Sequence, residues 1–325
     1  MRAIGHLPIR GAHGLIWRLN PLMKRRSSAE FEIRFDGRRY RGTLDDIIDW
    51  SLFFFGSYSP QELDFLATTA QLLGGARDGV TYFDVGANVG QHALFMSRRV
   101  ANVIAFEPSA WACERFSANL KLNGITNVRL FPTALGDTDA QGELGSGFEG
   151  NSGSRSLTWT LAAEKMERVA IRRGDELVRE EGIERLDILK VDVEGYEKRV
   201  LTGLKDTLMS DRPVILMELI GKSEKGGYRN VDELRDTLYP DHQLFTLRGH
   251  RRAELVPFDW NGEAAVCVPL ELVPEFRSLC GRSRPWASIL LLARGRQDAY
   301  LSHPALPFRF AYSRDAYSMP AVAKC

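Results

Sequence analysis

Apolar and polar positions follow two spacings along the chain, and together they predict an α/β fold. Short β-branched, aromatic or apolar runs indicate strands, and an apolar residue every three to four positions indicates helices. The predicted strands of the sheet are residues 81–85, 102–106, 128–131, 186–191, 214–217, 242–247 and 287–293. The predicted helices include residues 44–55, 61–73, 111–123 and 231–239, and others begin near residue 93 and contain Val200. Strands that alternate with helices are typical of a mostly parallel sheet.

A small cap is predicted ahead of this sheet. Residues 31–35 alternate between apolar and polar, Asp36-Gly37 is a hairpin turn signal, and residues 38–41 return. Residues 1–30 combine basic and apolar side chains. This pattern fits a surface helix or loose terminus better than a membrane-touching helix or a transit peptide.

Three parts are therefore expected along the chain. Residues 1–76 form the N-terminal cap of helices and a hairpin, residues 77–295 form the domain built on the sheet, and residues 296–325 form a tail that packs on that domain. The stretch between the last two predicted strands reads as irregular and could form walls around an acceptor. Residues 142–158 are rich in glycine and serine, which is typical of a mobile active-site flap or of a flexible hairpin.

The turn after the first sheet strand carries the first chemical signal. The strand ends at Asp84, and Gly86 and Gly90 follow before a helix begins. Glycines let backbone amides approach a ligand, and a helix start presents free N–H groups. The run lacks both the third glycine of the dinucleotide fingerprint and the Lys-Ser/Thr of a P-loop. An acid here suits a ligand with an ammonium group and no phosphate, such as S-adenosylmethionine; the alternative is a tight turn without a ligand.

A second acid, Glu107, ends the next predicted strand, about 20 residues after the glycine turn. An acid in this position can accept hydrogen bonds from both ribose hydroxyls. Any ribosyl cofactor would satisfy it, so Glu107 alone does not separate S-adenosylmethionine from NAD. A solvated acid before the helix that begins near Pro108 is the alternative.

Acids also follow the strand at residues 186–191. In open parallel sheets ligands bind outside the carboxyl ends of the strands. A carboxylate there can orient or deprotonate an acceptor hydroxyl, so Asp192 and Glu194 are the predicted catalytic residues, with Asp192 as the preferred base. Glu197 has the alternative of stabilising the N-terminus of the next helix.

Three further residues are candidate acceptor contacts. Tyr58 precedes the sheet domain, His92 lies beside the glycine turn, and Glu218 ends the strand at residues 214–217. A turn aromatic and a packed or capping histidine are the structural alternatives for the first two. Asp192 and Glu218 could offer oxygen ligands to Mg²⁺, but no third ligand is evident, so no metal is predicted.

Composition narrows the class of protein. Lys and Arg number 43 against 42 Asp and Glu, and this net charge of +1 gives no electrostatic argument for nucleic acid. The four cysteines have no metal-binding spacing and fit a reducing compartment, so a cytoplasmic location is expected. No run reaches the roughly 20 apolar residues of a membrane span.

Four blocks of sequence, in their order and spacing, resemble FkbM-type methyltransferases. They are Asp84–Gly90, Phe106–Pro108, Ala134–Asp137 and Lys190–Glu197. The resemblance implies a class I, Rossmann-like fold whose mostly parallel sheet has an antiparallel last strand. It also implies methyl transfer from S-adenosylmethionine to a free hydroxyl of a small molecule or glycan, such as a sugar or hydroxylated natural product.

The resemblance also implies roles for single residues. Asp84, Gly86 and Asn88 would hold the methionine part of the cofactor, Glu107 the ribose, and Asp137 the adenine side. The full set of implied cofactor-binding residues is Asp84, Gly86, Asn88, Gly90, Glu107, Pro108, Leu135 and Asp137. Asp192 and Glu194 would face the acceptor.

One segment departs from the family, and two other functions remain open. Arg173–Leu177 stands where the family usually reads Thr-Leu-Asp-Asp-Leu, although a helix is still predicted there. An NAD-dependent Rossmann oxidoreductase is one alternative, against which the missing third glycine and Asp84 both count. A non-catalytic binding module of the same fold is the other, and the intact acids count against it.

Overall fold

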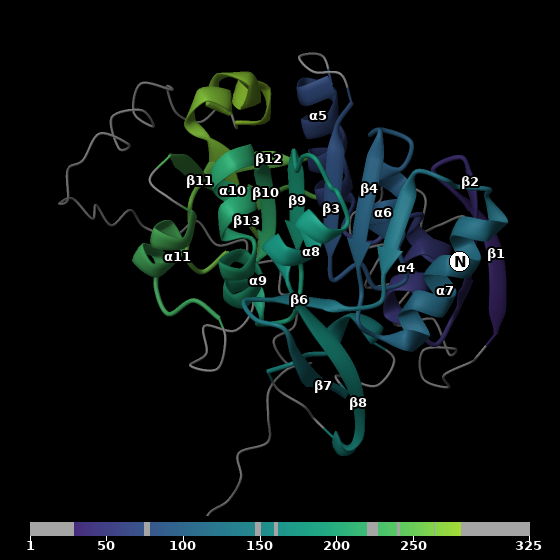
Figure 1. Ribbon diagram of the computed structural model, residues 1–325. Coiled ribbons are helices and arrows are strands. Elements are labelled where there is room, and N and C mark those ends of the chain that lie inside the picture. Colours follow the sequence, from purple (N-terminus) through teal and green to yellow (C-terminus); the bar gives the residue numbers. More distant parts are fainter. Residues whose placement is uncertain are drawn as a thin grey trace, which may run out of the picture. The chain divides into compact units, whose positions relative to one another are not determined.

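An eight-stranded sheet organises the part of the chain that the computed structural model describes (Figure 1). The described residues are 29–74, 79–146, 151–158, 162–219, 227–238, 241–262 and 264–280. The predictions for the basic N-terminus, for a strand over residues 287–293 and for the C-terminal tail lie outside these residues. No helix of the described residues has the length and apolar character needed to cross a bilayer.

The order of strands in this sheet is β12-β11-β13-β10-β9-β3-β4-β5. Their bounds are β3 Thr81–Val85, β4 Asn102–Phe106, β5 Val128–Phe131, β9 Ile188–Val191, β10 Val214–Glu218, β11 His242–Arg248, β12 Glu254–Pro257 and β13 Ala264–Pro269. Neighbours from β10 to β5 are parallel, whereas β13 is antiparallel to both β10 and β11. The predicted class I sheet, mostly parallel with an antiparallel last strand among the described residues, is confirmed.

Two strands of the sheet were not predicted. β12 and β13 lie in the stretch that was expected to be irregular, so that prediction is wrong for these residues. β13 inserts between β10 and β11, and Val266 and Cys267 within it are fully buried. A short apolar run with both faces covered has no alternation, so its period does not distinguish it from other buried segments. A 3₁₀ segment, η2 Leu270–Leu279, follows it.

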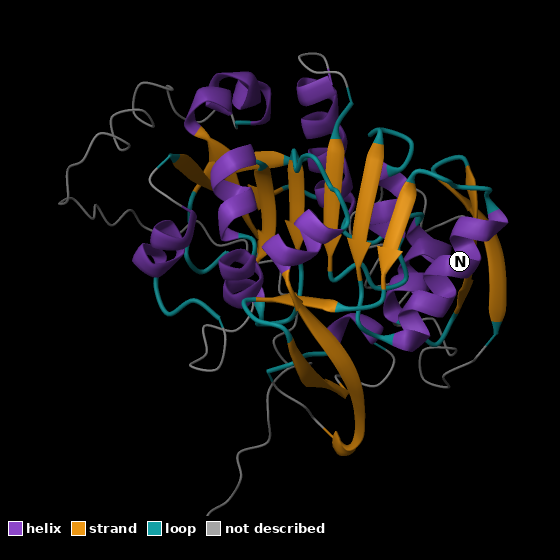
Figure 2. Cartoon of the chain, in the orientation of Figure 1, coloured by secondary structure: helices purple, strands orange, loops and turns teal. Residues whose placement is uncertain are grey.

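Helices cover both faces of the sheet (Figure 2). Their bounds are α5 Pro60–Gly74, α6 Gln91–Met96, α7 Ala110–Leu122, α8 Gly174–Glu180, α9 Glu197–Gly203, α10 Lys205–Asp211 and α11 Val231–Leu238. The main apolar core joins one sheet face to α8, α9, α10 and α11. Helices α5 and α6 contact β9, β3 and β4.

The strand register sorts polar and apolar side chains onto different faces. Asp84 in β3 pairs with Lys190 in β9, while their neighbours Phe83 and Leu189 pair with each other. Side chains of paired residues share a face of the sheet and alternate along each strand. Phe83 and Leu189 belong to the main core, so Asp84 and Lys190 project from the opposite face.

The sheet also reverses its direction of growth beside these residues. From β3 the chain proceeds outward to β4 and β5, and from β9 it proceeds the other way to β10. The junction of β3 and β9 is therefore a topological switch point, where open α/β sheets form their ligand crevice. Asp84 near the end of β3 and Asp192 just after β9 flank this junction.

The described residues begin with the predicted hairpin. β1 Glu30–Phe35 and β2 Arg38–Thr43 pair antiparallel. Asp36 and Gly37 both have positive φ, 49° and 77°, as a two-residue hairpin turn requires. α4 Ile47–Phe55 follows, and the Asp46 side chain caps it by accepting from two backbone N–H groups of the first turn. Both helices predicted in the cap are confirmed.

A second, three-stranded sheet lies beyond β5. It consists of β6 Ala134–Gly136, β7 Ala140–Ser146 and β8 Ala162–Arg173, in the order β6-β8-β7. β7 and β8 are antiparallel, so residues 142–146 of the Gly/Ser-rich stretch form part of a strand pair, and the mobility expected of that stretch stays a prediction. A short 3₁₀ turn, η1 Ser152–Ser154, follows in the same stretch.

Candidate active site

The carboxylate of Asp84 is fully buried at the switch point. Neither of its oxygens has a hydrogen-bond partner of ordinary geometry among the described residues. Burial raises the pKa of Asp84, while the positive charges of Lys190 and His92 oppose that rise. An unpaired buried carboxylate is costly, and such a group is suited to bind a ligand that carries positive charge.

The glycine turn after Asp84 uses its backbone amides within the protein. The N–H groups of Gly86 and Ala87 donate to the carbonyl oxygen of Phe106, at 3.0 and 3.1 Å, and the N–H of Gly90 donates to Ala87. These three N–H groups are therefore engaged within the protein, and the roles of Gly86 and Gly90 in cofactor binding stay predictions. Sequence reasoning missed that the turn must bond to the end of the neighbouring strand β4.

Packing explains why both positions are glycine. Gly86 has φ of 81°, and a Cβ there would lie 1.8 Å from the carbonyl oxygen of Asp192. Gly90 has φ of 84°, and a Cβ there would lie 2.2 Å from the ring of Phe116. Gly86 thus lets the turn approach the loop after β9, which brings the two sides of the crevice together.

Glu107 lies at the end of β4 and is 7% exposed. One carboxylate oxygen accepts from the N–H of Asn88 and the other from the N–H of Ser109, each at 2.8 Å. Burial raises its pKa to about 7, against the effect of these two hydrogen bonds and of the Arg155 charge. A carboxylate has about four lone-pair sites, so Glu107 can still accept from ligand hydroxyls.

The other predicted cofactor residues have varied surroundings. The side-chain oxygen of Asn88 accepts from the hydroxyl of Ser152 at 3.2 Å. Pro108 is half-buried next to Glu107. Leu135 is 1% exposed and belongs to the main core, so only its backbone is available to a ligand. Asp137 forms an ion pair with Arg199 at 3.1 Å. These roles stay predictions.

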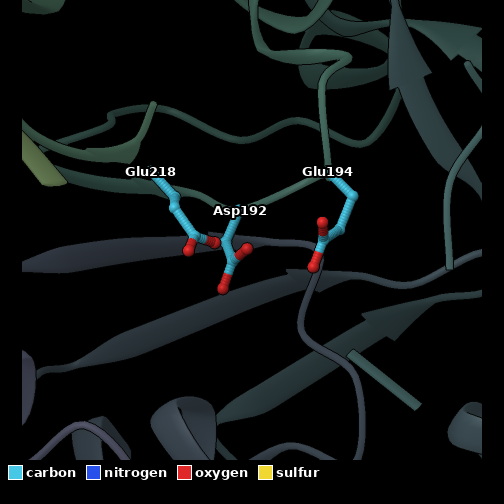
Figure 3. A group of neighbouring side chains, drawn as sticks. All are labelled: Asp192, Glu194 and Glu218. Atoms are coloured by element: carbon cyan, nitrogen blue, oxygen red, sulfur yellow. The ribbon is translucent and has the colours of Figure 1, made fainter. Parts of the chain in front are cut away.

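Three carboxyl groups gather at the ends of β9 and β10, and we call them the acid cluster: Asp192, Glu194 and Glu218. Figure 3 shows the three side chains next to one another, with Asp192 in the middle. One oxygen from each lies within 4.8 Å of the others. Glu194 has φ of 53°, and this turn brings it back beside Asp192.

The acid cluster corrects one part of the sequence analysis. A third oxygen ligand was not foreseen beside Asp192 and Glu218, and that expectation is wrong because Glu194 supplies one. Three carboxylate oxygens are a donor set that divalent cations such as Mg²⁺ accept. No described residue of this cluster contributes nitrogen or sulfur, so a transition metal is a poorer fit.

A buried lysine next to the acid cluster balances its charge. The Lys190 ammonium lies 2.9 Å from a carboxylate oxygen of Asp192, and Lys190 is 3% exposed. Burial alone would lower the pKa of Lys190, but the charges of Asp192 and Asp84 outweigh it and raise that pKa. Lys190 therefore stays positively charged. Its signal in the sequence was a lysine within an otherwise apolar strand.

The three acids differ in their protonation. Burial would raise the pKa of Asp192, but the Lys190 ammonium and a hydrogen bond from Glu218 outweigh it, and the pKa is about 2. Burial and the Asp192 charge raise the pKa of Glu218 well above its ordinary value. Burial and the charges of Asp192 and Glu197 raise the pKa of Glu194 to about 8. These shifts favour the ionised form of Asp192 and the protonated form of Glu218.

The remaining predicted residues border this region. His92 Nε2 lies 3.3 Å from a carboxylate oxygen of Glu62, an α5 residue that sequence reasoning missed because nothing local distinguishes it. His92 lies in the first turn of α6, directly after the glycine turn, and is 8% exposed. Tyr58 is 36% exposed, and its backbone N–H and carbonyl both bond to the Gln91 side chain, at 3.0 and 2.9 Å.

Glu197 has the structural role that the sequence analysis gave as its alternative, at the start of the helix after β9. It is 2% exposed, lies in the first turn of α9, and accepts from the N–H of Gly195 at 2.9 Å. This carboxylate stabilises the turn that carries Glu194.

Comparisons with known proteins relate the chain to methyltransferases. A family model described as "Methyltransferase FkbM domain" matches residues 84–249. The hexuronic acid methyltransferase AglP of Haloferax volcanii is 32% identical over 145 residues, which cover 45% of this chain and 58% of AglP. The 31-O-demethyl-FK506 methyltransferase FkbM of Streptomyces tacrolimicus is 29% identical over 160 residues, which cover 40% of this chain and 61% of that protein.

A third relative is much longer than this chain. The AMB antimetabolite synthetase AmbE of Pseudomonas aeruginosa is 30% identical over 207 residues, which cover 50% of this chain and 10% of AmbE. In all three cases the similarity spans less than two thirds of the relative's own length.

Proposed function

This chain belongs to the FkbM methyltransferase family, and we propose that it transfers a methyl group from S-adenosylmethionine to a hydroxyl oxygen of a sugar, glycan or hydroxylated natural product. Membership in a methyltransferase family counts against the NAD-dependent oxidoreductase alternative. The activities named for AglP and FkbM, on a hexuronic acid and on 31-O-demethyl-FK506, support the acceptor class.

The observation that carries this proposal is the pair of buried acids at the ends of adjacent strands. Asp84 is fully buried without a partner of ordinary geometry, and Glu107 is held by two backbone N–H groups. Asp84 would bind the ammonium group of the cofactor, Glu107 the ribose hydroxyls, and Asn88 the methionine end. When bound, S-adenosylmethionine supplies a methyl group already activated by its positively charged sulfur.

We assign the acceptor hydroxyl to the acid cluster, because its carboxylates gather at the carboxyl ends of β9 and β10. A protein that uses an activated methyl group must mainly align the acceptor oxygen at about 3 Å and exclude water. Asp192 is held as an anion by Lys190 and can orient the acceptor hydroxyl by accepting its hydrogen bond. The hydroxyl proton then needs an acceptor within reach.

Glu194 fits the role of proton acceptor better than Asp192. A general base works best when its pKa lies near the working pH. The pKa of Glu194 is about 8, whereas that of Asp192 is about 2, so Asp192 holds a proton poorly. We therefore assign Glu194 as the base and Asp192 as the orienting residue, which revises the order of preference drawn from the sequence.

No bound metal is required in this proposal. Lys190 already supplies the positive charge that a cation would bring to Asp192. The cap takes part through Glu62 of α5, whose charge acts on both Lys190 and Glu218. The division into cap, domain and tail, and a cytoplasmic site of action, are kept as proposals.

A direct assay tests the function. The purified full chain is incubated with S-adenosylmethionine and a panel of neutral glycosides, uronic acids and hydroxylated natural products, and products are analysed by mass spectrometry. We expect a gain of one methyl group on a hydroxyl of at least one acceptor class. Binding of S-adenosylhomocysteine without turnover of any acceptor would favour the non-catalytic binding module. Binding of NAD in place of S-adenosylhomocysteine would overturn the cofactor assignment.

A further inference from the structure

The segment Asn151–Thr158 crosses three loops at the carboxyl ends of the sheet. The Ser152 hydroxyl donates to the side-chain oxygen of Asn88, in the turn after β3, at 3.2 Å. Arg155 donates to the hydroxyl of Ser109, in the loop after β4, at 2.6 Å. The Ser156 hydroxyl donates to the carbonyl oxygen of Glu194, in the loop after β9, at 2.7 Å. One short segment therefore touches both the cofactor side and the acceptor side of the crevice.

The segment is well anchored for a stretch so rich in serine and glycine. The N–H of Ser152 donates to the carboxylate of Asp46 at 2.8 Å, and Asp46 also caps α4. The Asn151 side chain accepts from the N–H of Gly153 at 3.1 Å. Ser154 is 4% exposed. These contacts tie the segment to the N-terminal cap as well as to the sheet.

Arg155 is the charged residue of this segment, and it lies beside the loop that holds Glu107. The same guanidinium nitrogen that donates to Ser109 also donates to Glu167 of β8 at 2.8 Å. The N–H of Ser109 in turn donates to the Glu107 carboxylate at 2.8 Å. The other Glu167 oxygen accepts from the N–H of Ala110 at 2.8 Å. Arg155 thus holds in place the loop whose Ser109 N–H donates to Glu107.

Two charged side chains and one thiol, each from a different segment, lie around Glu107. Arg155 contributes a positive charge that lowers the pKa of Glu107, and Glu167 contributes a negative charge that raises it. The Cys113 thiol of α7 donates to the carbonyl oxygen of Glu107 at 3.0 Å. Burial raises the pKa of this thiol to about 12, so it stays neutral. Of the two charged side chains, only Arg155 favours the ionised form of Glu107.

We propose that Asn151–Thr158 forms a wall of the cofactor site and that Arg155 within it is a positioning residue for Glu107. It holds the Glu107 carboxylate ionised and, through Ser109, oriented to accept the ribose hydroxyls. This inference rests on the proposed function, because it needs Glu107 to bind the ribose.

The pH dependence of S-adenosylhomocysteine binding, measured by calorimetry on the full chain, tests this role. The wild-type affinity should fall as the pH drops through about 7, where Glu107 takes up a proton. Arg155→Gln removes the charge that lowers this pKa, so the midpoint should move to higher pH. At neutral pH the affinity should be about tenfold weaker, and it should recover in more basic buffer.

Two further variants separate charge from structure. Glu167→Gln removes the opposing negative charge and keeps an oxygen for the N–H of Ala110, so its midpoint should move to lower pH. Arg155→Lys keeps the positive charge and should retain a midpoint close to that of the wild type. Thermal unfolding checks that every variant is folded.

Three results would overturn the inference. An unchanged midpoint in Arg155→Gln with normal affinity removes the role of Arg155. A loss of affinity that is equal at every pH shows a structural effect only. A wild-type chain that binds no S-adenosylhomocysteine refutes the proposed function itself, and the inference falls with it.

Discussion

The ammonium nitrogen of Lys190 lies 2.9 Å from a carboxylate oxygen of Asp192, and Lys190 is also the strand partner of Asp84. One buried cation therefore stands between the acid proposed to bind the cofactor and the acid proposed to orient the acceptor. This arrangement keeps Asp192 ionised although it is crowded by Glu194 and Glu218.

Replacing this cation should destabilise the protein in a pH-dependent way. In Lys190→Met the buried acids lose their counter-charge, and breaking a buried pair costs about 3 kcal/mol or more. Asp192 would then no longer be held at a pKa of about 2, and it could escape the cost by taking up a proton at lower pH. Urea unfolding should therefore show a larger loss of stability at about pH 8 than at about pH 5.5. An equal loss at both would contradict the electrostatic account.

Removing the proposed base should abolish turnover but not cofactor binding. Glu194→Gln should lower kcat about 100-fold or more, with the affinity for S-adenosylhomocysteine unchanged within about twofold. A carboxyl with raised pKa is a base only above that pKa, so the wild-type rate should rise with pH through about 8. This rise should be missing in the residual activity of Glu194→Gln. A rise that persists would assign the base elsewhere.

Neutralising either of the two acids proposed to bind the cofactor should weaken cofactor binding, whereas neutralising an exposed acid should not. Asp84→Asn and Glu107→Gln should each weaken S-adenosylhomocysteine binding about tenfold or more by calorimetry. The Tm of Asp84→Asn should fall less than that of Lys190→Met, because relief from burying the Asp84 charge offsets part of the counter-charge that Lys190 loses. Asp232→Asn in α11, where the side chain is 83% exposed, is the control. Unchanged affinity in both site variants would remove the site assignment.

Chelation should leave the activity intact. The acid cluster has the oxygen ligands for Mg²⁺, but Lys190 already compensates Asp192. We expect equal initial rates with EDTA and with added Mg²⁺ at saturating cofactor and acceptor. Loss of activity with EDTA and its return with Mg²⁺ would instead make the acid cluster a metal site.

The attachment of the hairpin and α4 to α7 should depend on a buried ion pair, and the stability of the protein should depend on it too. Asp49 is fully buried and accepts from the Tyr40 hydroxyl and the Thr43 N–H, and Arg115 of α7 pairs with it. Arg115→Met leaves the buried Asp49 charge without its counter-charge and should destabilise the protein by about 3 kcal/mol in urea unfolding.

A second substitution tests the cause. Burial raises the pKa of Asp49 to about 6, so the environment of this side chain disfavours a negative charge and should tolerate a neutral group. Adding Asp49→Asn to Arg115→Met should therefore restore part of the lost stability. A double variant as unstable as Arg115→Met alone would show that packing, not charge, accounts for the effect.

Much of the site could be inferred from local sequence. The acids at 84, 107, 192 and 218 each follow an apolar run, and a parallel sheet places such strand ends on one edge. The hairpin at Asp36-Gly37 could also be predicted from the sequence, since few residue pairs tolerate two positive φ angles in succession. The two glycines of the turn were harder to interpret. Gly86 and Gly90 are required by close packing against Asp192 and Phe116, which are distant in the sequence.

The sequence by itself determined the order of most strands and helices, though not β12 and β13, and which strand ends carry acids, because periodicity and turn chemistry act over a few neighbouring residues. Only the tertiary structure decided that β13 inserts beside β10, that Lys190 shares a face with Asp84, and that Glu194 turns back to Asp192. It also decided that Arg155 reaches the loop beside Glu107. These relations join residues from separate elements, and packing and strand register, which no local pattern encodes, bring them together.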